Sequence, residues 1–97
     1  MAKGPEYAVK QKVKALLKAH GAWFFMPFMA GMGGNGVPDF VGIHKGKGFG
    51  IECKAGKNKT TVLQEIQLAE ILAAGGFPLV VNEVTGLDTL EVWLKNG

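Results

Sequence analysis

Residues 36–55 decide the fold of this chain, and they read GVPDFVGIHKGKGFGIECKA. Within them, residues 39–44 and 47–55 have the composition and the alternation of side chains that are typical of short β-strands. The Lys-Gly-Lys sequence between them supplies a two-residue turn, centred on either Lys45-Gly46 or Gly46-Lys47. The stretch therefore predicts a β-hairpin.

The second strand of this hairpin divides its side chains between two faces. Phe49, Ile51 and Cys53 alternate with Glu52 and Lys54, and alternate residues of a strand point to opposite faces. The apolar set is expected in the core, which makes Cys53 a buried thiol rather than a nucleophile. Glu52 and Lys54 are expected to project side by side from the other face, away from that core.

Pairing across the hairpin brings a second carboxylate to the same place. A Lys45-Gly46 turn puts Asp39 opposite Glu52, whereas a Gly46-Lys47 turn puts Asp39 opposite Lys54. Both registers bring two carboxylates and one ammonium group within about 5 to 8 Å of one another. The sequence leaves the choice of register open.

Such a cluster suits one kind of chemistry. Neighbouring carboxylates repel each other unless a cation offsets their charge, and their oxygens suit Mg²⁺ or Mn²⁺ rather than zinc. A metal of this kind binds phosphate oxygens and acidifies a water molecule, which promotes phosphodiester cleavage. Lys54 would orient or deprotonate that water. Asp39, Glu52 and Lys54 therefore predict a metal-dependent hydrolase of phosphate esters.

The chain before the hairpin predicts one helix and one edge strand. Apolar residues recur at helical spacing between residues 5 and 20, with lysines between them. Residues 22–28 are rich in aromatic side chains and suit a strand, but Pro27 either makes it an edge strand or ends it. A flexible glycine-rich loop is expected at residues 29–36.

The chain after the hairpin predicts two helices and one strand. Thr61 and Gln64 have the spacing of a capping box at the start of a helix over residues 62–74, which two glycines close. Residues 77–81 predict a buried strand, parallel to one before that helix, and residues 87–94 predict a short helix. The order α-β-β-β-α-β-α indicates an α/β fold in two or three layers.

Length and composition fit one domain over residues 1–97 with a single core, since 47% of the residues are hydrophobic and 20% are charged. The net charge is +3 and all eleven basic residues are lysine, which favours attraction to phosphates over reading of bases. The single cysteine has no disulfide partner, and neither a signal-peptide pattern nor a membrane-length apolar run is present. These features predict a cytoplasmic protein.

Gly36-Val37-Pro38-Asp39 and Ile51-Glu52-Cys53-Lys54, with Gln64 at the head of a helix, resemble the virus-type replication-repair nuclease (VRR-NUC) domain. This family is a branch of the restriction-endonuclease-like superfamily, whose core motif is PD-(D/E)xK. The resemblance extends from Glu6 to about Val84 and implies a mixed sheet flanked by helices. The chain departs from the family pattern in lacking arginine and in having Thr61-Val62 where Ser-Pro is commoner.

The resemblance also implies what each residue of the motif does. Asp39, Glu52 and the backbone carbonyl of Cys53 would bind Mg²⁺ or Mn²⁺, with Glu6 as a further ligand. The implied catalytic residues are Asp39, Glu52, Lys54, Gln64 and Glu6. Members of this family cleave DNA, and small stand-alone forms resemble dimeric enzymes that resolve four-way (Holliday) junctions. We therefore expect a homodimeric endonuclease for branched DNA, acting in DNA repair in a bacterial or phage-infected cell, with no organic cofactor.

Simpler roles remain open for several of these residues. Gln64 is also explained as a helix cap, and Glu6 as a first-turn acid that suits the helix dipole. The lysines either follow a phosphate backbone or keep the surface soluble. The candidate DNA-binding residues are Lys57, Lys59, Lys45, Lys47, Lys10 and Lys14. Met26, Met29 and Met32, among aromatic residues, predict a core or a dimer contact.

Two other functions stay open at this point. A DNA-binding module could keep the fold without the activity, although paired carboxylates would weaken phosphate binding in the absence of a cation. A sequence-specific restriction enzyme of the same superfamily would need recognition loops and base-reading side chains, for which this short chain without arginine has little room.

Overall fold

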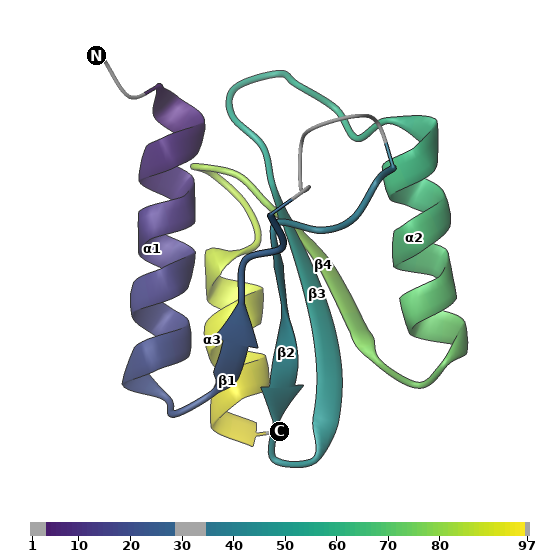
Figure 1. Cartoon of the computed structure of the whole chain (residues 1–97). Helices are drawn as coiled ribbons and strands as arrows, with labels where there is room; N and C mark the ends of the chain where they lie inside the picture. The colour runs from purple at the N-terminus through teal and green to yellow at the C-terminus, as the bar shows by residue number, and fades with distance from the viewer. Residues whose placement is uncertain (1–3, 29–34, 97) are drawn as a thin grey trace.

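The computed structural model describes residues 4–28 and 35–96, and Figure 1 traces the chain through them. The elements are α1 (Pro5–Ala19), β1 (Trp23–Phe25), β2 (Phe40–His44), β3 (Lys47–Cys53), α2 (Val62–Ala73), β4 (Phe77–Val81) and α3 (Leu87–Asn96). The predicted α/β class and order of elements are confirmed. Across the described residues, no helix is both long and apolar enough to cross a membrane.

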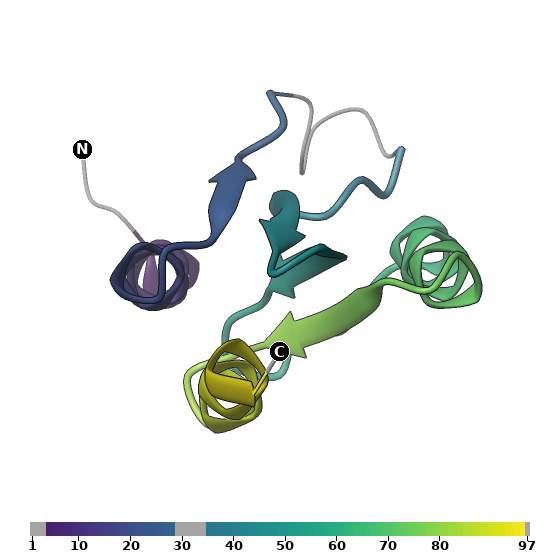
Figure 2. The ribbon, with the colours of Figure 1, turned by 90° about the horizontal axis from the view of Figure 1, so that it is seen from below.

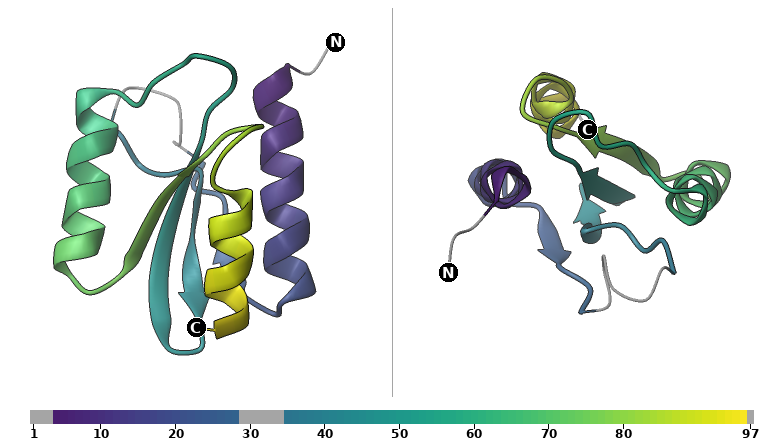
Figure 3. Two further views of the ribbon diagram at one scale, coloured as in Figure 1. Left: turned by 180° about the vertical axis from the view of Figure 1, so that it is seen from behind. Right: turned by 90° about the horizontal axis from the view of Figure 1, so that it is seen from above.

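The four strands form one mixed sheet in the order β1-β2-β3-β4. β1 pairs with β2 and β2 with β3 in antiparallel fashion, whereas β3 and β4 are parallel as predicted. α1 and α3 lie on one face of the sheet and α2 lies on the other, as the view from below shows (Figure 2). The structure thus has three layers, with α1 and α3 side by side when the sheet is seen from behind (Figure 3).

The hairpin of β2 and β3 has the first of the two predicted registers. His44 pairs with Lys47, and the turn between them has positive φ angles of 51° at Lys45 and 81° at Gly46. Positive φ at both central residues is the type I′ geometry whose twist matches that of antiparallel strands. This register carries Asp39, immediately before β2, to a position beside Glu52.

The core fills the space between the sheet and the layer of α1 and α3. Its buried members are Val9, Val13, Leu17, Phe40, Phe49, Ile51, Cys53, Val81, Leu90 and Leu94. The predicted alternation along β3 is confirmed, because Phe49, Ile51 and Cys53 all face this core. Trp93 of α3 stacks on Phe77 of β4 with ring centroids 4.5 Å apart. The intervening residues of β3 are left to face α2.

Two predictions about the strands are wrong in detail. Residues 77–81 form an edge strand with mostly half-buried side chains instead of a buried strand, because no other strand of the described residues pairs with the far side of β4. Its edge position also tolerates Pro78, which cannot donate a backbone hydrogen bond. The strand expected over residues 22–28 is confirmed as an edge strand but is confined to Trp23–Phe25.

Most of the predicted glycine-rich loop lies outside the described residues, as do Met29 and Met32. Its last two residues, Asn35 and Gly36, are described and are held against α2. The backbone oxygen of Asn35 accepts a hydrogen bond from the Gln67 side chain. A Cβ on Gly36, whose φ is +77°, would lie 2.4 Å from the backbone of Leu63, so only glycine allows this close approach.

Candidate active site

Asp39 lies at the end of the sheet where β2 begins, and it is 3% exposed. Its Oδ2 accepts a hydrogen bond of 2.8 Å from the backbone N–H of Cys53. This contact continues the β2–β3 ladder by one step with a side chain in place of a backbone carbonyl. The carboxylate is therefore fixed in position by the same register that orders the hairpin.

Glu52 lies on the opposite face of β3 from Cys53, as predicted. It is nevertheless buried, because only 3% of its surface is exposed. The reason is the close packing of α2 on β3. A Cβ on Gly50 would lie 2.5 Å from Cδ1 of Ile71, so the glycine lets the helix approach the strand. The first turn of α2 then covers the Glu52 carboxyl group.

Gln64 serves the helix and the site at the same time. Its side-chain Oε1 accepts a hydrogen bond from the backbone N–H of Thr61 at 2.9 Å. Its backbone N–H donates to the Thr61 hydroxyl at 3.2 Å, which completes the predicted capping box. Its Nε2 donates to Oε2 of Glu52 at 2.9 Å. The two roles that the sequence left open are compatible because they use different atoms of one amide.

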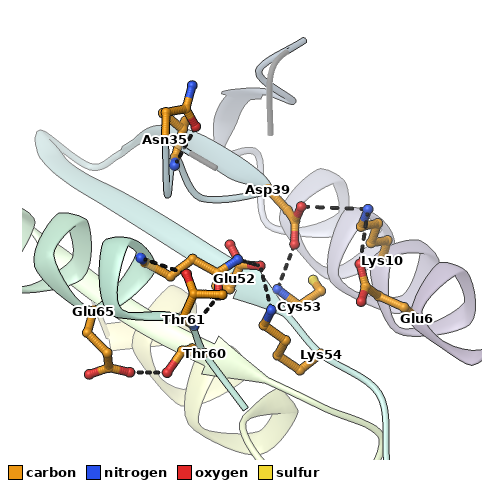
Figure 4. A network of polar contacts seen from close by, with 12 residues as sticks. Glu6, Lys10, Asn35, Asp39, Glu52, Cys53, Lys54, Thr60, Thr61 and Glu65 are labelled. Carbon is orange, nitrogen blue, oxygen red and sulfur yellow. Dashed lines mark hydrogen bonds and ion pairs between the residues drawn. The ribbon is translucent and has the colours of Figure 1, made fainter. Parts of the chain in front are cut away.

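Each of the two carboxyl groups has its own lysine nearby (Figure 4). Nζ of Lys54 lies 3.8 Å from Oε2 of Glu52, and Nζ of Lys10 lies 3.6 Å from Oδ1 of Asp39. Lys10 also pairs with Glu6 at 3.4 Å, one helical turn earlier in α1. Lys10, which the sequence predicted only as a DNA-binding residue, therefore links Glu6 to Asp39.

The charges of the site perturb its titratable groups. Burial, and then the negative charge of Asp39, raise the pKa of Glu52 to about 8 although Lys54 opposes the shift. Burial lowers the pKa of Lys10, but the charges of Asp39 and Glu6 outweigh it, so that the pKa is raised overall. Burial, with the nearby carboxylates, raises the pKa of the Cys53 thiol well above its usual range, in keeping with a buried, unreactive cysteine.

These residues surround one cavity of about 270 Å³ at the end of the sheet. Its lining residues are Glu6, Asn35, Gly36, Asp39, Glu52, Lys54, Thr61 and Gln64. Oε1 of Glu52 is buried and has no hydrogen-bond partner among the described residues. A buried polar atom without a partner is energetically costly unless a ligand satisfies it. All five predicted catalytic residues thus lie around one cavity.

The donor atoms of this cavity suit a hard divalent cation, although the described residues contain no group of three or more histidine, cysteine, aspartate or glutamate side chains arranged to hold a metal ion. Asp39 and Glu52 supply carboxylate oxygens. The Lys54 N–H donates to the carbonyl of Val81 at 2.9 Å, and because the peptide is trans, the Cys53 carbonyl points the opposite way, toward the Asp39 side. Cys53 is not among the residues that line the cavity, so the cavity itself gathers two carboxylates, which together with water are oxygen ligands that Mg²⁺ or Mn²⁺ accepts.

The predicted DNA-binding lysines are divided between the two ends of the molecule. Lys57 and Lys59 are exposed in the loop between β3 and α2. This loop connects Lys54 to Thr61, which both line the cavity. Lys45 and Lys47 lie at the hairpin turn, at the other end of β2 and β3 (Figure 1). Lys14 is half-buried one turn beyond Lys10 on α1. The structure therefore gathers only part of the predicted set around the acidic cavity.

Asn35 and Thr61 also line the cavity, and sequence reasoning missed them as members of the site. Thr61 was predicted only as a helix cap. It lies near Glu52 because Gln64, its partner in the capping box, also hydrogen-bonds to Glu52. Comparison of the chain with protein-family models and with curated proteins finds no match in either set.

Proposed function

We propose that this chain is a metal-dependent nuclease that hydrolyses phosphodiester bonds of DNA. The observation that carries the proposal is the buried pair Asp39 and Glu52, with one Glu52 oxygen lacking a partner, beside Lys54 in a single cavity. Burying two carboxyl groups together is costly for a purely structural site. A divalent cation offsets that cost and gives the arrangement a use.

The residues divide the chemistry of hydrolysis between them. Asp39, Glu52 and the Cys53 carbonyl would hold Mg²⁺ or Mn²⁺, which would supply positive charge to the phosphate and make a water molecule more acidic. Lys54 orients the attacking water or accepts its proton, and afterwards offsets negative charge that develops on the phosphate. Gln64 keeps the Glu52 carboxylate in one orientation, since its own position is fixed by the α2 cap.

DNA as the substrate, and branched DNA in particular, is the finer part of the proposal. The net charge of +3 and the exposed Lys57 and Lys59 beside the cavity support a polyanion. The resemblance of the Pro38-Asp39 and Glu52-Cys53-Lys54 motifs to the virus-type replication-repair nuclease domain supports a four-way junction as the preferred structure and a homodimer as the active form. Two sites in one particle would cut two strands.

The experiment compares a four-way junction with a linear duplex of matched sequence, with Mn²⁺, with Mg²⁺ and with chelator. We expect metal-dependent cleavage that is faster on the junction and at least about a hundredfold slower in D39N, E52Q and K54A, as for removal of a central catalytic group. V84D, an exposed change outside the cavity, is the matched control. Full activity in chelator, or in folded D39N, would contradict the proposal.

A further inference from the structure

Half of one face of the sheet has no helix over it among the described residues. α2 packs on β3 and β4, while β1 and β2 extend beyond it, as the view from below shows (Figure 2). The rings of Phe24 and Phe40 contact each other at a tilt on the side of α1 and α3. The alternate residues of β1 and β2 therefore point to the opposite face, which no described helix covers at this place. Those residues are Trp23, Phe25, Val41 and Ile43.

The exposed side chains on this face are apolar and contact one another. Trp23 is 62% exposed, Phe25 is 48% exposed and Ile43 is 46% exposed. The rings of Trp23 and Phe25 contact each other with centroids 5.9 Å apart, and Trp23 pairs across the strands with Ile43. At about 200 Å² for each large side chain, these exposed portions amount to roughly 300 Å² per molecule.

A groove lies next to these aromatic residues on the same face. Across the sheet, Trp23 is followed by Ile43 and then by Gly48, whose missing side chain leaves the floor of the groove open. The groove has a volume of about 420 Å³ and lies between the β2–β3 hairpin and the end of α2. Gly48, Val41, Ile71, Gly75 and Gly76 are among its lining residues. One face therefore carries both a projecting aromatic pair and an apolar recess.

We propose that this face, composed of Trp23, Phe25, Ile43 and the adjoining groove, binds the same face of a second copy of the chain. A two-fold contact needs a surface that complements itself, and here the aromatic pair of each copy would enter the groove of the other. The exposed apolar area would form the centre of such an interface, with a polar margin around it. The inference gives the homodimer of the proposed function its contact surface.

Charge favours a second copy over nucleic acid as the occupant. Lys47 is the one charged side chain among the described residues that line the groove, whereas a phosphate-binding surface needs several cations. Two molecules of net charge +3 repel each other, and they approach at least cost through a face that carries little charge. Aromatic and aliphatic residues without charges are also the composition of interface centres.

The test measures molecular mass by sedimentation equilibrium, in chelator and without DNA, so that it reads association alone. We expect wild-type protein to reach twice its 10.3 kDa mass as its concentration is raised, and W23D to dimerise at least about tenfold more weakly. G48L is the second variant, because a Cβ there meets only the Gly42 oxygen at 3.8 Å. Its leucine fills the groove of a folded monomer and should weaken association to a similar degree.

V84D is the matched control, since Val84 is an exposed apolar residue in the loop after β4, and it should dimerise as wild type does. A wild-type protein that stays monomeric at millimolar concentration overturns the inference. So does a dimer that W23D and G48L both leave intact, or a monomer whose affinity for single-stranded DNA falls in W23D. This experiment does not measure nuclease activity. An inactive protein can therefore still confirm the contact surface, and an active nuclease can still lack it.

Discussion

The side-chain amide of Gln64 joins the cap of α2 to the buried carboxyl group of Glu52: Oε1 accepts from Thr61 N–H at 2.9 Å, and Nε2 donates to Glu52 Oε2 at 2.9 Å. The capping box fixes the Gln64 side chain on the first turn of α2, so that its Nε2 has a defined position beside Glu52. The local signal that starts a helix thus also orients a group of the candidate active site.

This double role predicts different outcomes for Q64A and T61A. T61A removes the hydroxyl of the cap and should cost about 1 kcal/mol of folding free energy, with little change in activity. Q64A loses its part of the cap and also the bond to buried Glu52, so we expect about 2 kcal/mol and at least tenfold slower cleavage. Chemical denaturation and single-turnover cleavage measure the two effects. Equal activity losses in the two variants would mean that the Glu52 contact has no catalytic value.

The raised pKa of Glu52 predicts that the metal-free protein loses stability as the pH rises. The folded state favours the protonated carboxyl up to about pH 8, whereas the unfolded chain ionises near its ordinary pKa of 4.5. Stability from this group is therefore complete below pH 4.5 and is lost as the pH rises through 8. We expect wild type to lose roughly 4 kcal/mol from this group between pH 5 and 9.

The control for this pH effect is E52Q, which cannot ionise and should lack that part of the pH dependence. Thermal unfolding in chelator at pH 5, 7 and 9 measures both proteins. Mn²⁺ should restore wild type at pH 9 and leave E52Q unchanged, because only the carboxylate gains a cation. Identical pH profiles for the two proteins would contradict the assignment.

Lys10 predicts opposite changes in metal binding and in DNA cleavage. Its ammonium group lies 3.6 Å from Asp39 Oδ1, where it offsets the charge that would attract a cation. K10Q should therefore bind Mn²⁺ several-fold more tightly by calorimetry, yet cleave DNA several-fold more slowly because a cation beside the phosphate is lost. K18Q, which changes an exposed lysine two turns further along α1, is the matched control. Weaker Mn²⁺ binding in K10Q would show that Lys10 orders Asp39 for the metal instead.

The lysines at the two ends of the sheet predict unequal effects on DNA binding. The double variant K57Q/K59Q removes two charges beside the cavity, and K45Q/K47Q removes the same number at the hairpin turn. We expect the first to weaken junction binding about tenfold at low salt and to reduce its salt dependence by about two phosphate contacts. The second should change binding much less. Fluorescence anisotropy over a range of salt concentrations measures both, and a reversed ranking would move the DNA to the hairpin end.

The sequence alone determined the features that rest on local rules. Alternation along residues 47–53 separated the core face of β3 from the face of Glu52, and the Thr61–Gln64 spacing identified the start of α2. The order of elements, and the parallel orientation of residues 77–81 to one of the earlier strands, also followed from periodicity and from the intervening helix. These are short-range properties of the backbone, and neighbouring residues are enough to fix them.

Only the tertiary structure decided the features that depend on packing between distant elements. It chose the Lys45-Gly46 register, buried Glu52 beneath α2 through the close approach at Gly50, and brought Lys10 to Asp39 from a helix at the other end of the chain. It also left β4 at an edge and Trp23 on an uncovered face. Burial, and the charge balance that follows from it, are set by which surfaces meet, and no local pattern carries that information.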